Sequence, residues 1–454
     1  MKPTRIYILL LMLAAACAEP KKESVPDPQE EASMTTVVAD TFPVSTVIAR
    51  VECSKNPALS YALFLPARHK ENISLPALIF TDPHGDGSLP LNMYSALAEK
   101  YGVILIGSND CKNGLTFNQA SPILQVLTSE VFSRFKADGK QISFAGFSGG
   151  AKAAMVAATE LSSIHTLIYC GAGFKEIPSP LPPSLGITGI KDMNYTEVIE
   201  TDLQITNTGN SHAVIEWNGK HEWSDPQTFE NAFYWLHFRA MEKKISAVDQ
   251  KMVQSFLSAN KNAEKSVLKD EKRLLKIIYF LNGVADLTTY SNELASLRKQ
   301  QSYFSAKRKE KDDFALEMRL KENYIQCIEI KDLFWWRDEM VNFRKAGNNP
   351  MNDRIKGYIS LACYSFSSSA IKKNDLRGAE KYLGVYAMAD PENPDRAFMQ
   401  ACLYAKRQNK TGALQSIREA ITYGFKDKAK LESEPSFSSI RNSPEFNALL
   451  LKMN

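Results

Sequence analysis

Between residues 46 and 244, short apolar runs alternate with segments whose apolar residues recur at helical spacing. The first two runs are rich in β-forming residues and are separated by a short turn, which predicts an antiparallel pair. Six continuous apolar runs follow, as expected for parallel strands that are covered on both faces. The eight expected strands are residues 47–53, 59–67, 77–80, 102–107, 142–147, 166–171, 185–190 and 213–217. Helical patterns at 91–102, 123–135, 150–161 and 228–244 complete an α/β architecture, a mostly parallel sheet with helices on both sides.

The hydrophobic pattern changes beyond residue 244, where glycine becomes scarce and Lys, Glu, Leu and Ala dominate. Helical spacing runs through residues 247–258, 265–282, 289–324 and 334–345. In the last of these, Phe334, Trp335 and Trp336 are expected to belong to a core rather than to a binding site. Residues 245–345 are therefore predicted to form a helical region after the sheet.

Two segments near the end of the chain, 374–391 and 408–425, are similar to each other. The corresponding positions are the small residues Ala379 and Ala413, 34 apart, and the large apolar residues Leu383 and Ile417. Small residues let paired helices cross closely, and large ones fill the space beside them. The period and these positions resemble the tetratricopeptide repeat. That resemblance implies an all-α helical-repeat domain over 346–454, with 434–450 as a terminal cap and a surface for a protein partner.

Residues 1–17 have the order of a secretory signal: a basic start, an apolar run too short to span a bilayer, and three alanines before Cys17. The alanines and Cys17 resemble a bacterial lipobox, although Ala14 stands where Leu is usual. This implies lipidation of Cys17 and an exported protein anchored in the bacterial cell envelope, at the outer membrane or the periplasmic face. An ordinary signal peptide with an incidental cysteine is the alternative. Residues 18–45, rich in Pro and acidic residues, are expected to be a flexible linker.

Composition narrows the possible partners. The 454 residues carry 55 Lys and Arg against 51 Asp and Glu, a formal net charge of +4 that gives no electrostatic reason to expect nucleic acid. None of the six cysteines after Cys17 lies in a CxxC pair, which argues against a zinc site. Cys53 and Cys111 are the only plausible disulfide pair, and the sequence leaves that pairing open.

Residues 146–150 carry the clearest chemical signal, the run Gly-Phe-Ser-Gly-Gly between an apolar strand pattern and an Ala-rich helix pattern. A strand-to-helix turn this tight requires residues without side chains two positions before and two positions after Ser148, which are Gly146 and Gly150. The turn pushes the Ser148 hydroxyl above the sheet edge, beside the free N–H groups of a helix N-terminus. Ser148 is therefore the candidate nucleophile. A solvent-facing serine in a glycine-rich turn is the alternative.

A serine hydroxyl needs a base to become a good nucleophile. Asp192 follows the seventh expected strand and His221 follows the eighth, so both lie at the sheet edge where Ser148 emerges. The chain order of nucleophile, acid and base predicts a triad of Ser148, Asp192 and His221. Asp202 is the alternative acid. His165, His212 and His237 fall at strand starts or inside a helix and are weaker candidates for the base.

These features together resemble the α/β-hydrolase fold, with its serine elbow after the fifth strand. The resemblance implies an esterase-like serine hydrolase that works through an acyl-enzyme and needs no metal or organic cofactor. It also places half of an oxyanion hole after the third strand, where this chain has His84-Gly85-Asp86-Gly87 instead of the HGGG form. The donors it implies are the N–H of Gly149 and one N–H from Gly85 or Asp86.

Polar residues near the expected site favour a polar substrate. His84, Asn109, Asn113 and Trp223 are the predicted substrate-binding residues. The segment 174–184 is too short and too rich in proline for a helical lid, which indicates an open site and an ester on a polar molecule such as a sugar.

Two other functions stay open from the sequence. A serine peptidase on the same fold is one, because a single triad can cleave esters or amides. An interaction scaffold whose hydrolase part has lost activity is the other, and the intact triad order counts against it. Because the strand pattern and its last helix end by Lys244, a cut there is predicted to leave a folded hydrolase. The alternative is that the helical stretch 247–345 packs on the sheet region and belongs to its core.

Overall fold

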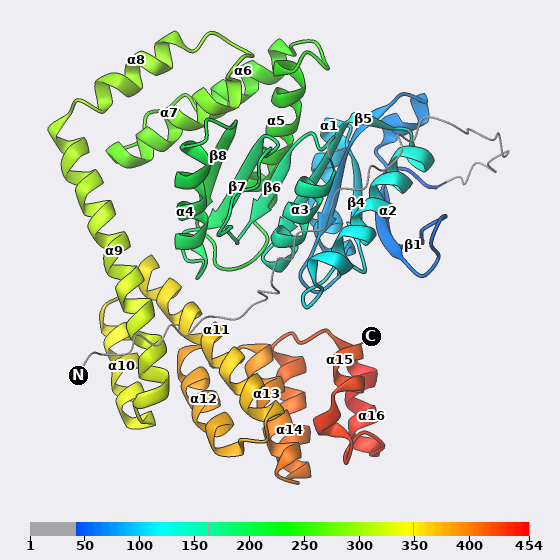
Figure 1. The fold of residues 1–454 in the computed structure, drawn as a ribbon, viewed down its shortest axis with the longest axis vertical. Helices are drawn as coiled ribbons and strands as arrows, with labels where there is room; N and C mark the ends of the chain where they lie inside the picture. The colour runs from blue at the N-terminus through cyan, green and yellow to red at the C-terminus, as the bar shows by residue number, and fades with distance from the viewer. Residues whose placement is uncertain (1–41, 162, 348, 454) are drawn as a thin grey trace, which may run out of the picture.

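The computed structural model describes residues 42–161, 163–347 and 349–453. The chain forms a sheet region followed by a long series of helices (Figure 1). The signal segment 1–17, with Cys17, and most of the linker 18–45 lie outside the described residues. Within the described ranges, no helix has the length and apolar character needed to cross a bilayer.

The sheet has eight strands, and their bounds are β1 (Val47–Glu52), β2 (Ser60–Phe64), β3 (Leu75–Thr81), β4 (Ile104–Ser108), β5 (Ala137–Phe147), β6 (Leu167–Cys170), β7 (Ser184–Gly189) and β8 (His212–Trp217). Their spatial order is β1-β2-β4-β3-β5-β6-β7-β8. β2 runs antiparallel to both of its neighbours, β1 and β4. The other six strands, β3 to β8, are parallel to one another. The mostly parallel sheet expected from the apolar runs is confirmed.

Five helices connect or follow these strands, namely α1 (Ser88–Tyr101), α2 (Phe117–Phe135), α3 (Gly149–Glu160), α4 (Tyr195–Thr206) and α5 (Pro226–Glu242). Buried residues of α2, α3 and α4 form one core with one face of the sheet, and those of α1 and α5 form another with the opposite face. α4 is not expected from the sequence pattern. It buries only Val198 and Ile205 among its large apolar residues, so its helical period is weak.

The core on the α5 face continues past residue 244. It includes side chains from α6 (Gln250–Ala259) and α7 (Val267–Leu281), which pack on α5. The Phe256 ring lies 5.3 Å from that of Phe238, and the Phe280 ring lies 5.1 Å from that of Trp235. Two later helices therefore cover the last helix of the sheet region, and whether a chain cut at Lys244 stays folded remains a prediction.

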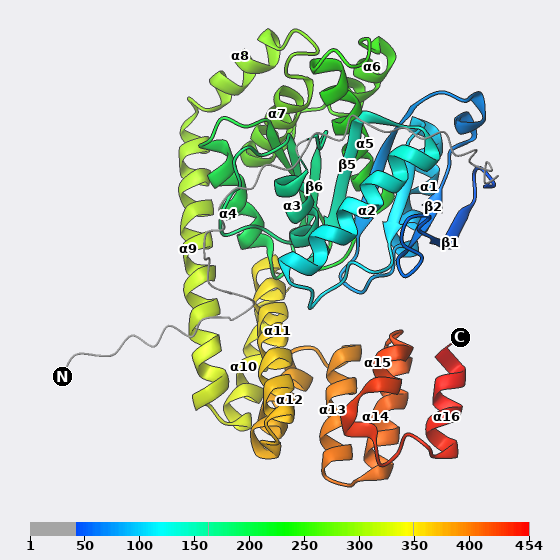
Figure 2. The same ribbon diagram turned by 45° about the vertical axis from the view of Figure 1, so that its right-hand side comes forward.

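The remaining helices are α8 (Thr288–Leu297), α9 (Gln301–Ile330), α10 (Leu333–Lys345), α11 (Pro350–Lys372), α12 (Leu376–Ala389), α13 (Pro394–Lys406), α14 (Lys410–Thr422), α15 (Lys428–Ser433) and α16 (Pro444–Leu450). Short 3-10 turns occupy Ala67–Glu71, Pro435–Phe437 and Leu451–Met453. Figures 1 and 2 show α9 running lengthwise past α4, from α8 at one end of the molecule to α10 and α11 at the other. α11 pairs with α12 and α13 pairs with α14. Ala379 and Ala413 are fully buried in this part, and its kinship to tetratricopeptide repeats stays a prediction.

The aromatic run on α10 does not all belong to the core. Trp336 is fully buried together with Met340 and Phe343, which follow it at helical spacing, whereas Phe334 is 70% exposed. Successive helix residues point about 100° apart, so three in a row cannot share one face. The expectation of a core position is therefore right for Trp336 and wrong for Phe334.

Cys53 and Cys111 are both buried as free thiols rather than joined in a disulfide. Burial raises the pKa of Cys53 to about 11 and that of Cys111 to about 12. Both side chains pack in the core on the α2 and α3 face of the sheet, where they act as small apolar residues.

Candidate active site

The turn from β5 into α3 holds Ser148 in an unusual backbone conformation, with a φ of 52°. A Cβ on Gly146 would lie 2.2 Å from the carbonyl oxygen of Gly150, and one on Gly150 would lie 2.0 Å from that of Thr81. Any side chain at either position would collide with backbone, which explains the glycines of the motif. The Ser148 N–H donates to the Cys170 carbonyl at 2.8 Å and ties the turn to the neighbouring strand.

In the predicted triad, His221 lies within hydrogen-bond distance of both Ser148 and Asp192. His221 Nε2 lies 2.9 Å from Ser148 Oγ, and His221 Nδ1 lies 2.9 Å from Asp192 Oδ1. Asp192 is almost completely buried and the His221 side chain is 20% exposed, so the base reaches solvent while its acid does not. The contacts are those needed to pass a proton from the serine to the imidazole while the carboxylate orients the ring.

The Asp192 carboxylate has few partners of its own. Besides His221, Oδ1 accepts the Asn194 N–H at 2.8 Å. Oδ2 is buried and has no hydrogen-bond partner among the described residues, and a Cβ on Gly171 would lie only 2.9 Å from it. The position of this acid therefore depends mainly on the backbone of the loop between β7 and α4.

The alternative acid and the other histidines lie elsewhere. Asp202 is 3.1 Å from His212 Nδ1, and the other ring nitrogen of His212 is 2.7 Å from the Tyr169 hydroxyl. Burial lowers the pKa of His165 and of His237 to about 4 each. None of these histidines is placed beside Ser148 by any contact in the described chain.

The two halves of the predicted oxyanion hole differ in how free their donors are. Gly149 is the first residue of α3, where the helix has no carbonyl to receive its N–H. The Gly85 N–H donates to the Asp82 carbonyl at 3.0 Å, because Gly85 closes a turn with a φ of 71°. That leaves the Asp86 N–H as the second candidate donor.

Asp82, at the end of β3, is a buried carboxylate that the sequence analysis does not single out. Its Oδ2 accepts the Trp223 indole N–H at 2.9 Å, and its Oδ1 accepts the His84 N–H at 2.8 Å. The hydrogen bond from the exposed His84 imidazole to Asp82 raises the pKa of His84. Trp223 is 6% exposed and contacts the Phe147 ring at 5.5 Å, so it supports the site from the core and does not line the rim. An acid directly after a parallel strand is the signal that could have identified Asp82.

The two predicted asparagines lie in different settings. Asn109 Oδ1 accepts the Gly87 N–H at 3.2 Å, and its Nδ2 donates to the Ala49 carbonyl at 3.2 Å, so its amide braces the turn after β3. Asn113 is exposed and lies directly on the elbow, since a Cβ on Gly149 would meet Asn113 Oδ1 at 1.7 Å. Of the two, only Asn113 has its amide against Gly149, the residue after Ser148.

A further charged pair lies beside the triad. Lys152 of α3 is 3.8 Å from Glu197 of α4. Burial raises the pKa of Glu197, and the nearby Asp192 carboxylate adds to the shift. The sequence pattern does not indicate either residue, because the approach of α3 to α4 depends on the tertiary structure.

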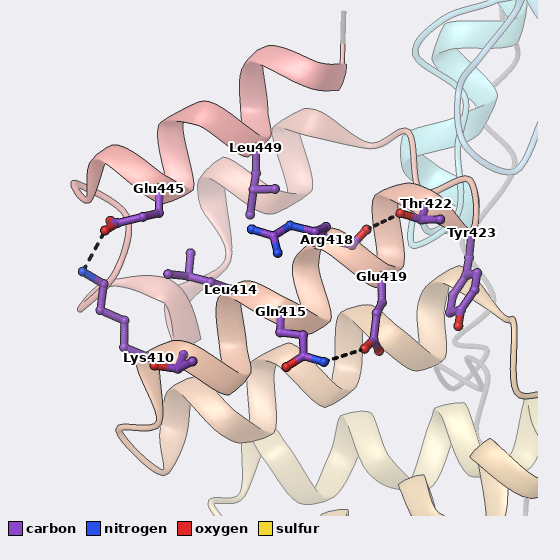
Figure 3. Close-up of a pocket in the computed structure, with 10 residues that line it drawn as sticks. Lys410, Leu414, Gln415, Arg418, Glu419, Thr422, Tyr423, Glu445 and Leu449 are labelled. Carbon is purple, nitrogen blue, oxygen red and sulfur yellow. Dashed lines mark hydrogen bonds and ion pairs between the residues drawn. The ribbon is translucent and has the colours of Figure 1, made fainter.

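A cavity of about 710 Å³ lies away from the triad, between α14 and α16 (Figure 3). Its polar groups pair with one another: Lys410 lies 3.6 Å from Glu445, and the Gln415 amide donates to Glu419 at 3.3 Å. No histidine, serine or cysteine is among the residues that line it, so the cavity holds no serine–histidine or cysteine–histidine pair. In the described ranges, no three His, Cys, Asp or Glu side chains are grouped to hold a metal ion, and the expected lack of a cofactor stays a prediction.

The strand order, the antiparallel β2 and the serine elbow after β5 define the α/β-hydrolase fold. Similar solved structures include an esterase from Pyrobaculum calidifontis, 14% identical over 45% of this chain and 87% of that chain, with a TM-score of 0.35. An S-formylglutathione hydrolase from Staphylococcus aureus is 14% identical over 43% of this chain and 98% of that chain, with a TM-score of 0.36. Esterase 2 from Thermogutta terrifontis is 12% identical over 46% and 99%, with a TM-score of 0.35. Neither a protein-family model nor a curated protein matches the chain.

Proposed function

We propose that this protein is a serine hydrolase that cleaves a carboxylic ester of a polar molecule. The observation that carries the proposal is the continuous relay from Ser148 Oγ through His221 to Asp192, with 2.9 Å at each step. The strained φ of Ser148 supports it, because such backbone strain at a serine is typical of a nucleophile elbow.

In the proposed mechanism, His221 Nε2 accepts the hydroxyl proton as Ser148 Oγ attacks the carbonyl carbon of the ester. The N–H groups of Gly149 and Asp86 bind the negative oxygen that forms. His221 then gives the proton to the leaving alcohol, and an acyl group stays on Ser148. Water, activated by the same imidazole, attacks the acyl-enzyme and restores the serine. Asp192 orients His221 and stabilises its charged form.

The surroundings of Ser148 favour a polar substrate. The exposed Asn113 amide and the Lys152–Glu197 pair offer hydrogen bonds and charge near the nucleophile. The connection from β6 to β7 forms no helix, so it contributes no helical lid over the site. We infer that the alcohol or the acyl part of the ester carries hydroxyl or amide groups, as in an ester on a sugar.

A fluorophosphonate probe tests the proposal, since it labels serines that a base has activated. We expect one adduct, on Ser148, and none in Ser148→Ala or His221→Ala. Ser133→Ala, which changes an exposed serine on α2, is the matched control and should label like the wild type. A panel of aryl esters, acetylated and feruloylated sugars, and peptides then separates an esterase from a peptidase. A folded wild type without any adduct would favour the inactive scaffold and overturn the proposal.

The place of action is a separate proposal. We propose that Cys17 is lipidated after export and that the linker to residue 45 holds the hydrolase clear of the membrane surface. Cys17→Ser should move the protein from the membrane fraction to the soluble fraction or stop its processing. Membrane attachment that persists in Cys17→Ser, with no acyl mass on the N-terminus, would refute the anchor while leaving the hydrolase proposal intact.

A further inference from the structure

The loop that carries Asp192 is held from outside by two helices of the C-terminal region. Lys321 of α9 donates from Nζ to the Met193 carbonyl at 2.9 Å and to the Thr196 hydroxyl at 2.9 Å. Arg354 of α11 donates from Nη1 to the Ile190 carbonyl at 2.6 Å. The two cations thus bind backbone oxygens on both sides of Asp192 in the chain.

A single buried carboxylate fixes both cations. Glu317 of α9 accepts from Arg354 Nε at 2.9 Å and lies 2.9 Å from Lys321 Nζ. The side chains of Glu317, Lys321 and Arg354 are 1%, 5% and 11% exposed, so the cluster is shielded from water. Burial lowers the pKa of Lys321, and the Glu317 charge opposes that shift. Charged groups persist in such a place only when every one of them is paired, and this pairing fixes their geometry.

The contact between α11 and the loop is also close sterically. A Cβ on Gly357 would lie 3.2 Å from the Met193 Cβ, so the helix backbone lies almost against the loop. The Arg354 guanidinium stacks over the Tyr195 ring, 4.6 Å from its centroid. The loop is therefore held by packing as well as by hydrogen bonds.

We propose that Lys321 and Arg354 are positioning residues for catalysis, which hold the carbonyls of Ile190 and Met193 so that Asp192 meets His221. The proposal rests on the hydrolase function proposed above. Its physical basis is that Asp192 Oδ2 has no hydrogen-bond partner in the part of the chain that the structure describes, so little besides the loop backbone sets the direction of the carboxylate. The helical region is then a part of the active site, although it contributes no reacting group.

Steady-state kinetics on a soluble aryl ester, with the full-length chain, test the assignment. Lys321→Met and Arg354→Met should each lower kcat about 10- to 100-fold and leave KM nearly unchanged, since a displaced acid affects the reaction more than substrate binding. Arg273→Met is the matched control, because Arg273 is a buried cation paired with Asp270 and Glu293 between α7 and α8. It should lower the melting temperature and leave kcat within about twofold of the wild type.

A double-variant cycle separates positioning from general destabilisation. In an Asp192→Asn background, Lys321→Met should have little further effect on kcat, because residues that act as a unit are not additive. A full multiplicative loss in that background would overturn the proposal, as would wild-type kcat in both single variants. If Lys321→Met does not fold, the pair Glu317→Gln with Lys321→Met removes both charges together and serves the same cycle.

The outcome also distinguishes this inference from the function on which it rests. If the wild type forms no adduct at Ser148 and hydrolyses no ester, the proposed function fails. If the wild type is active and both Lys321→Met and Arg354→Met equal it in kcat, only the positioning role fails.

Discussion

The sheet region and the helical region both bury charged side chains, and some of these in the two regions have different kinds of partner. In the sheet region, Asp82 and Asp192 lie at the ends of strands and point to groups around the nucleophile. In the helical region, Arg273 and its partners join one helix to the next. The cluster of Glu317, Lys321 and Arg354 is the exception, because the two cations donate hydrogen bonds to the loop of Asp192, the proposed catalytic acid.

Under the proposed function, this difference teaches that a region without reacting groups can still belong to an active site. Parallel strands bring Ser148, Asp192 and His221 to one edge, and this gives the site its chemistry. The Asp192 loop at that edge makes few side-chain hydrogen bonds of its own. Lys321 of α9 and Arg354 of α11 donate further hydrogen bonds to its backbone. Variants in the helical region and variants in the sheet region can both test this interpretation, and their expected effects on activity and stability differ in size.

The largest effect is expected from removing the helices altogether. A chain ending at Lys244 loses five fully or nearly fully buried side chains from the core on α5, which are Val253, Phe256, Ile277, Phe280 and Leu281. Each such side chain contributes about 1.5–3 kcal/mol, and the whole domain is stable by only about 5–15 kcal/mol. We expect an insoluble or molten fragment without esterase activity, measured by near-UV circular dichroism and aryl ester hydrolysis. A soluble, fully active fragment would show that the sheet region stands alone.

A change confined to the sheet region comes next. Asp192→Asn should lower kcat by about 10³- to 10⁴-fold, because an amide favours the wrong tautomer of His221. The fold should persist, since the two side chains have nearly the same shape. Measured beside Lys321→Met, this variant sets the maximum loss that misplacing the acid can cause. A loss in Lys321→Met that exceeds it would point to damage beyond Asp192.

A substitution on α11, in the helical region, should change stability and activity in opposite directions, with a smaller effect on kcat than the variants above. Gly357→Ala adds about 1 kcal/mol of helix propensity to α11. The new Cβ would come 3.2 Å from Met193, so the loop must shift slightly. We expect a higher melting temperature together with a kcat about two- to fivefold lower. Ser369→Ala, at an exposed position of α11, is the control and should leave kcat unchanged. Equal gains in stability and unchanged kcat in both variants would argue against the close contact.

The smallest effect is a pH dependence of stability from Glu197, which lies between the two regions. Burial raises the pKa of Glu197. The Glu197 charge in turn contributes to the raised pKa of Tyr358 on α11, after the effect of burial. An acid with a raised folded pKa binds more protons in the folded state, so its contribution to stability falls as pH rises above the ordinary value of 4.5. In Glu197→Gln this component should vanish. Urea unfolding at a series of pH values measures it, and parallel curves for the two proteins would contradict the assignment.

Much of the sheet region was predictable because its signals are local. Continuous apolar runs indicate buried parallel strands, and the glycines around Ser148 are required by a turn of a few residues. The positions of Asp192 and His221 follow from the rule that parallel strands end at the same edge. Their mutual distances of 2.9 Å agree with that placement. α4 escaped prediction because its apolar period is weak.

The sequence by itself determined the eight strands, the elbow and the candidate triad, since neighbouring residues and strand order are enough to specify them. Only the tertiary structure decided that Trp223 supports the site from the core, that Phe334 is exposed, and that the core continues from α5 to α7. It alone brought Lys321 and Arg354 to the Asp192 loop, more than a hundred residues earlier in the chain. Contacts at such a separation depend on how whole helices pack. The spacing of Lys, Arg and Glu along a helix does not by itself distinguish a solvated face from a buried cluster of ion pairs.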